Sequence, residues 1–151
     1  MLNKKFIEAI KIISKKLNGK VKWSLIASTN LALQGMDVKP QDLDIVVRFE
    51  DLKKMPELFS DYNASEVKKI EKWKENPAWE VKLDINGVEV QILGENDNGE
   101  YVSKLIANKL TKISLEGSEI PCFTLKAEIQ TYEETSRNEK AERIKSFLSD
   151  R

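Results

Sequence analysis

The dipeptide Asn86-Gly87 constrains the fold of this chain more than any other feature of the sequence. It separates two runs in which apolar and polar residues alternate, one over residues 79–85 and one over residues 88–93. Asn and Gly accept the positive φ angles that a two-residue hairpin turn requires, and alternation is typical of a strand with one buried face. We therefore expect an antiparallel β-hairpin in this part of the chain.

The rest of the sequence predicts further strands with helices between them. Apolar residues at helical spacing over residues 6–17, followed by Asn18-Gly19, predict an N-terminal amphipathic helix and its end. Strands are expected at residues 21–26, 43–47 and 120–123, with a hairpin turn at residues 115–118 and a loop at residues 96–99. Helices are expected at residues 28–33, 51–59 and 125–133, with Thr124 as an N-cap, and a last helix is expected to begin with a capping box at residues 136–139. This order predicts one α/β (α+β) domain over residues 1–151, with a mixed, largely antiparallel sheet flanked by helices and a C-terminal helical pair.

Composition removes several classes of function. The chain has no histidine, which excludes Ser-His-Asp and Cys-His catalysis and histidine-ligated zinc. Twenty-five basic residues balance 25 acidic ones, so the net charge is zero and binding to long nucleic acid is not expected. The single cysteine, Cys122, cannot form an intramolecular disulfide, which suits the cytoplasm. No apolar run approaches the roughly 20 residues that span a bilayer, and no signal peptide is evident.

Asp42 and Asp44 are the strongest candidates for a functional site. They stand one residue apart at the start of an apolar segment, so a strand would project both carboxylates from one face and bury Leu43 and Ile45 on the other. Two neighbouring carboxylates repel each other unless a cation lies between them, and Mg²⁺ prefers oxygen ligands. The pair therefore predicts a divalent-metal site, of Mg²⁺ or Mn²⁺. The simpler alternative is a solvated edge of a strand.

The turn after the preceding strand is the second candidate. The small residues Ala27 and Ser28 lead from that strand into a helix, where backbone amides and a hydroxyl can receive a phosphate. Alternatively, Ser28 is the N-cap of the helix, and both roles are compatible.

Together these segments resemble the DNA polymerase β-like nucleotidyltransferase superfamily, in particular its minimal members. The similar segments are the strand and small-residue turn ending in Ala27-Ser28, the short helix ending at Gly35, the Asp42-x-Asp44 strand, the hairpin over residues 85–94, and the tail over residues 120–125 and 137–141. The resemblance implies that Asp42 and Asp44 hold metal ions, and that Ala27, Ser28 and their amides contact the phosphates of a nucleoside triphosphate. Arg137, at a helix start, could face the triphosphate or lie on the surface.

Two residues depart from the pattern of that superfamily. Ala27 stands where the superfamily has glycine, which lets the backbone approach phosphates closely. Gln91 occupies the position of the third carboxylate, and an amide oxygen can ligate a metal but cannot act as a base at neutral pH. Glu89 and Asp84, expected opposite each other in the hairpin, are the possible substitutes.

Two functions remain open from the sequence. The first is a metal-dependent nucleotidyltransferase that moves a nucleoside monophosphate from a nucleoside triphosphate to an unknown acceptor hydroxyl. The alternative is a catalytically impaired nucleotide-binding or regulatory module on the same fold. A chain this short could also complete its site with a partner chain or a homodimer.

Overall fold

The computed structural model describes residues 2–70, 78–94 and 110–151, so the predicted loop at residues 96–99 lies outside the described residues. Its helices are α1 (Lys4–Leu17), α2 (Ala27–Leu33), α3 (Phe49–Leu52), α4 (Met55–Leu58), α6 (Leu125–Glu134) and α7 (Asn138–Ser149), with a 3₁₀ turn at Ser60–Tyr62. Its strands are β1 (Trp23–Ile26), β2 (Leu43–Val47), β3 (Lys68–Lys69), β4 (Trp79–Ile85), β5 (Val88–Gly94), β6 (Leu110–Leu115) and β7 (Ser118–Phe123).

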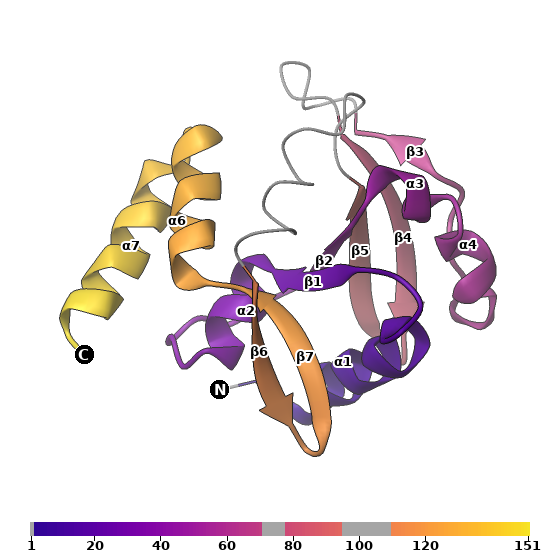
Figure 1. The fold of residues 1–151 in the computed structure, drawn as a ribbon, viewed down its shortest axis with the longest axis horizontal. Coiled ribbons are helices and arrows are strands. Elements are labelled where there is room, and N and C mark those ends of the chain that lie inside the picture. The colour runs from indigo at the N-terminus through magenta and orange to yellow at the C-terminus, as the bar shows by residue number, and fades with distance from the viewer. Residues whose placement is uncertain (1, 71–77, 95–109) are drawn as a thin grey trace.

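The described strands form one sheet in the order β3-β4-β5-β2-β1-β7-β6. The pairs β2–β5 and β1–β7 are parallel, and the other neighbouring pairs are antiparallel. Figure 1 shows β1 and β2 in the middle of the molecule, with α6 and α7 on one side and β3, β4 and α4 on the other. The predicted α/β (α+β) architecture, a mixed and largely antiparallel sheet with flanking helices, is confirmed.

Both predicted hairpin turns are present. Asn86 and Gly87 have φ angles of 52° and 93°, and they join β4 to β5 where Ile85 pairs with Val88. This combination of positive φ angles is that of a type I′ turn, whose twist matches the flanking strands. Glu116 and Gly117, with φ angles of 48° and 86°, join β6 to β7 in the same way. The first hairpin brings the candidate residues of β5 beside those of β2.

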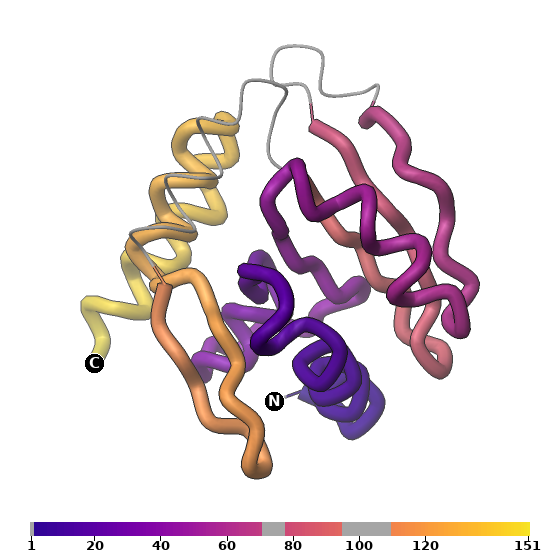
Figure 2. Tube along the Cα trace, turned by 45° about the vertical axis from the view of Figure 1, so that its right-hand side comes forward, coloured from indigo at the N-terminus to yellow at the C-terminus, as the bar shows by residue number. Residues whose placement is uncertain are grey.

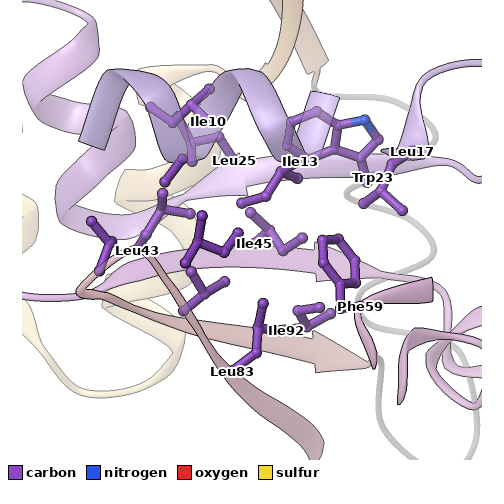
Figure 3. Close-up of a cluster of buried hydrophobic side chains, with 14 of the residues drawn as sticks. Ile10, Ile13, Leu17, Trp23, Leu25, Leu43, Ile45, Phe59, Leu83 and Ile92 are labelled. Atoms are coloured by element: carbon purple, nitrogen blue, oxygen red, sulfur yellow. The ribbon is translucent and has the colours of Figure 1, made fainter. Parts of the chain in front are cut away.

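The main hydrophobic core lies between α1 and one face of the sheet (Figure 3). The helix contributes Ile10, Ile13 and Leu17, which are fully buried as their helical spacing predicted. Each central strand contributes every second residue to this core, so Asp44, Gln91 and Glu80 lie on the opposite face. That face also carries a small apolar cluster, which includes Val46 and Leu93. None of the helices in the part of the chain that is described is long and apolar enough to cross a bilayer.

The single helix predicted over residues 51–59 is wrong. The structure has two short helices there, α3 and α4, and Pro56 lies in the first turn of α4. Proline lacks the N–H that an interior helical position must donate, but it is tolerated where that donor is unpaired in any case. The proline therefore begins a second helix instead of continuing the first, while Leu52, Met55 and Phe59 are still buried as their pattern predicted.

The predicted C-terminal helical pair is present, and its two helices lie alongside each other in both views (Figures 1 and 2). Thr124 caps α6 as predicted, because its hydroxyl accepts a hydrogen bond of 3.1 Å from the amide of Ala127. The predicted capping box at residues 136–139 is wrong. Ser136 has a φ of 60° and lies in the turn between the helices, and Arg137 occupies the cap position of α7 without a side-chain capping bond. The amide of Arg137 bonds back to the carbonyl of Tyr132 at 2.7 Å, which closes α6.

Candidate functional site

The start of β2 places Asp42 and Asp44 next to each other. Leu43 and Ile45 are fully buried in the core, so Asp44 projects from the other face of the strand, where it is half-buried. Asp42 is exposed and precedes the first residue of the strand. The hydroxyl of Thr29 on α2 donates a hydrogen bond of 2.9 Å to the carbonyl of Asp42, which ties the start of β2 to the helix that follows β1.

The electrostatic environment of Asp44 is unfavourable for its negative charge. Burial is the main cause of a pKa raised to about 6, and the neighbouring charges of Asp42 and, less strongly, Glu80 add to it. The positive charges of Arg137 and Lys140 act in the opposite direction. A carboxylate that is crowded by other carboxylates in this way is stabilised when a cation is added.

The turn between β1 and α2 is strained at the position where glycine was expected. Ala27 has a φ of 62°, in the left-handed region that glycine adopts freely and other residues adopt at a penalty. Its amide donates a hydrogen bond of 2.6 Å to Oε2 of Glu128 on α6, and Asn30 Nδ2 donates to the same oxygen at 2.9 Å. Ser28 is the second residue of α2 and Ile26 is the cap, so the predicted capping role of Ser28 is wrong.

Glu128 is a site residue that the sequence did not reveal. Its position in the first turn of α6 is typical of a surface glutamate, but only 2% of the residue is exposed. Burial raises its pKa to about 7, while its hydrogen bonds from Asn30 and Ala27 and the charge of Arg137 lower it. Because it accepts both hydrogen bonds from the turn, Glu128 holds the backbone of Ala27 in place beneath the candidate site.

Gln91 lies directly beside Asp44, since the two are paired across the parallel strands β5 and β2. Its Nε2 donates a hydrogen bond of 2.7 Å to Oε1 of Glu80 on β4. Glu80 is therefore a second residue that sequence reasoning missed, although the alternation in β4 places it on the polar face. The two substitutes proposed from the sequence do pair with each other near the hairpin turn, where Asp84 accepts a hydrogen bond of 2.8 Å from the amide of Gly87 and Glu89 is exposed.

Positive charge reaches the site from the C-terminal helices. The guanidinium of Arg137 lies over the ring of Tyr132, 4.9 Å from its centroid, and its Nε donates to Thr135 Oγ1 at 3.0 Å. Lys140 Nζ lies over the same ring, 5.6 Å from its centroid. Both side chains belong to exposed residues whose charges act on Asp44, so an anion bound near the two aspartates would be attracted to them.

The donor set fits a hard divalent cation that brings its own further ligands. Within residues 2–70, 78–94 and 110–151 there is no group of three or more His, Cys, Asp or Glu placed to enclose a metal ion. Mg²⁺ does not need such an enclosure, because it is usually held by one or two carboxylates and completes its shell with water and substrate phosphates. Asp42 and Asp44 are two oxygen donors of this kind.

Comparison with known proteins assigns the fold and the family. The family model described as aminoglycoside-2''-adenylyltransferase matches residues 9–146. A proposed nucleotidyltransferase from Thermotoga maritima has a similar structure, with a TM-score of 0.75 and 26% sequence identity over 100% of this chain and 97% of that one. A lincosamide antibiotic adenylyltransferase with bound lincomycin gives a TM-score of 0.57 at 17% identity, over 92% of this chain and 95% of that one, and so supports the fold alone. No curated protein matches the chain in the corresponding sequence comparison.

The fold is thus that of the nucleotidyltransferase superfamily, which confirms the resemblance inferred from the sequence. Because the family model covers most of its length, the chain belongs to the aminoglycoside-2''-adenylyltransferase family. The family model and the Thermotoga maritima protein are both described as nucleotidyltransferases, which supports an enzymatic function of this class.

Proposed function

We propose that this protein transfers a nucleoside monophosphate, with AMP as the first candidate, from a nucleoside triphosphate to the hydroxyl of a small molecule, with Mg²⁺ or Mn²⁺ as cofactor. The observation that carries the proposal is the pairing of the exposed Asp42 with the half-buried Asp44. The negative charges of Asp42 and Glu80 disfavour the ionised form of Asp44, and the positive charges of Arg137 and Lys140 favour it. The carboxylates of such a site attract a cation, and its two basic side chains attract an anionic substrate, so both can bind together.

Different residues would bind the metal and the phosphates in this reaction. Asp42 and Asp44 would hold the metal, which when bound supplies positive charge to the attacking and leaving oxygens of an in-line displacement. Ser28, in the first turn of α2, and Arg137 would hold the terminal phosphates, so that the departing pyrophosphate leaves toward positive charge. Glu128 keeps the turn at Ala27 in the shape that presents Ser28.

The acceptor is proposed as a polyhydroxylated small molecule. The family description names an aminoglycoside adenylyltransferase, and a protein of similar fold has lincomycin bound. These two compound classes are therefore the first acceptors to try. A second subunit could contribute to the acceptor side of the site, and a reducing cytoplasm suits the free and buried Cys122.

A second candidate function is a nucleotide-binding module without catalysis. The observation that favours it is Gln91, which lies beside Asp44 where the superfamily has a carboxylate able to accept a proton.

Calorimetric titration with MgATP and MgGTP tests both functions. We compare the wild type with the double variant Asp42→Asn, Asp44→Asn, and use Asp61→Asn as the matched control because Asp61 is an exposed carboxylate beside Lys16. Metal-dependent binding that only the double variant loses is expected. Absence of binding by the wild type contradicts both functions, and release of pyrophosphate in the presence of the acceptors separates the enzyme from the binding module.

A further inference from the structure

The carboxylate that is missing at Gln91 has a close counterpart on the next strand. Glu80, on β4, accepts a hydrogen bond of 2.7 Å from Gln91 Nε2, and its side chain is 13% exposed. Gln91 in turn pairs with Asp44 across β5 and β2. The polar face therefore carries a continuous row from Asp44 through Gln91 to a partly buried carboxylate.

The chemistry of the amide fixes how this row is oriented. An ionised carboxylate has only acceptor oxygens, so the NH₂ group of Gln91 must face Glu80 and its carbonyl oxygen must face away from it. Lys82 Nζ lies 4.0 Å from the same oxygen of Glu80. These two partners hold Glu80 Oε1 on the side of β4 that faces Gln91, while the carboxylate keeps a second oxygen for another donor.

The other carboxylates of the β4–β5 hairpin are less suitable than Glu80 as a replacement for the carboxylate absent at position 91. Asp84 Oδ1 accepts the amide hydrogen of Gly87 and so serves the turn, and Glu89 is exposed opposite it. Glu80 is the residue of β4 whose charge acts on Asp44, which shows that it lies within electrostatic reach of the candidate metal site.

We propose that Glu80 supplies the third carboxylate of this site and accepts the proton of the acceptor hydroxyl, while Gln91 is a positioning residue that orients it. This inference rests on the proposed function. In the step, the bond between the acceptor oxygen and the α-phosphorus forms as the bond from that phosphorus to the pyrophosphate oxygen breaks. The hydroxyl proton passes to Glu80, pyrophosphate leaves, and the proton is later released to solvent.

The test is an exchange of the two side chains. Glu80→Gln removes the carboxylate but keeps an amide in its place, and the double variant Glu80→Gln, Gln91→Glu restores one carboxylate and one amide with the hydrogen bond reversed. Glu119→Gln is the matched control, because Glu119 is a strand glutamate 3.6 Å from a lysine on the distant β6–β7 hairpin. We measure pyrophosphate release from MgATP with an aminoglycoside and with lincomycin, the dissociation constant of MgATP, and the melting temperature.

Glu80→Gln is expected to lower kcat at least about 100-fold, the usual size of a lost general base, with the MgATP dissociation constant and melting temperature unchanged. The exchanged double variant is expected to recover at least part of that loss, and Glu119→Gln to behave as wild type. An unchanged kcat in Glu80→Gln overturns the inference. A loss of MgATP binding equal to the loss of turnover also overturns it. Both outcomes leave the proposed function standing. If the wild type releases no pyrophosphate with either acceptor, the proposed transfer itself is overturned for these compounds, and the inference with it.

Discussion

On one face of β2, Leu43, Ile45 and Val47 are fully buried against the core. On the other face, Asp44 is half-buried and subject to the charges of its neighbours, while Val46 is buried in a smaller apolar cluster. The same division continues onto β5 and β4, where the polar side chains of Gln91 and Glu80 alternate with buried apolar ones. Alternate residues of a strand point to opposite faces. Leu43 and Ile45 therefore contribute to stability, while Asp44 between them contributes to the proposed chemistry. Substitutions one residue apart should therefore have separable effects.

The largest effect is expected from Asp44→Asn. Turnover should fall at least about 100-fold, as when one electrostatic stabiliser of a transition state is removed. The pKa of Asp44 is raised in the folded protein, so its ionised form opposes folding above about pH 6, and without divalent metal the variant should be more stable than wild type at pH 8. Urea unfolding in EDTA at pH 5 and pH 8 measures this. A variant that is inactive because it is unfolded would break the proposed separation.

Ile45→Ala tests the other face of the same strand. Ile45 is fully buried, and truncation of a buried isoleucine to alanine destabilises by about 2–5 kcal/mol through lost burial and the cavity left behind. Urea unfolding should show this loss, while the folded fraction keeps metal-dependent MgATP binding close to that of wild type. Loss of binding in fully folded protein would show that the two faces are coupled.

Glu128→Gln tests the buried acid beneath the site. Its pKa is raised from 4.5 to about 7, so the folded state holds the proton more tightly than the unfolded chain. The resulting contribution to stability is complete below about pH 4.5 and is lost as the pH rises through 7, a difference on the order of 3 kcal/mol. Wild type should lose stability over this range, and the variant should show a flatter profile. Identical pH profiles for the two proteins would argue against this role of Glu128.

The smallest effect is expected from Ala27→Gly. At a φ of 62°, glycine should stabilise the fold by roughly 1 kcal/mol, because it adopts the left-handed region without steric penalty. Ala32→Gly, inside α2, is the matched control and should destabilise by roughly 0.5–1 kcal/mol. Thermal unfolding of the two variants checks the signs. If both destabilise, the backbone at Ala27 is not strained.

Local signals in the sequence were enough to predict much of the fold. Asn86-Gly87 and Thr124 act through the backbone of their immediate neighbours, and both have the predicted roles. The same kind of reasoning failed at Pro56, where a continuous apolar pattern concealed a break, and at Ser136, where a motif of the right spacing lies in a turn.

The candidate site was only partly predictable, for a physical reason. Asp42, Asp44 and Gln91 stand out because strand alternation or family resemblance applies to them one by one. Glu128 acts through a hydrogen bond to Ala27, 101 residues away in the chain, and no local pattern distinguishes it from a surface glutamate. Glu80 was partly predictable. The hairpin register places Lys82 opposite Gln91, and Glu80, two residues earlier on the same face of β4, is therefore near the amide of Gln91.

The parallel pairing of β1 with β7 also determines when the site can form during synthesis. Leu25 pairs with Cys122, and the amide of Ala27 donates to Glu128, so β1 and the turn at Ala27 lack these partners until β7 and α6 have left the ribosome. Contacts between residues so far apart in the chain slow folding, since a long loop must close before they form. A nascent chain that ends after β5 would carry both aspartates and the hairpin but an unsupported turn. Activity should therefore appear only after β7 and α6 have been synthesised.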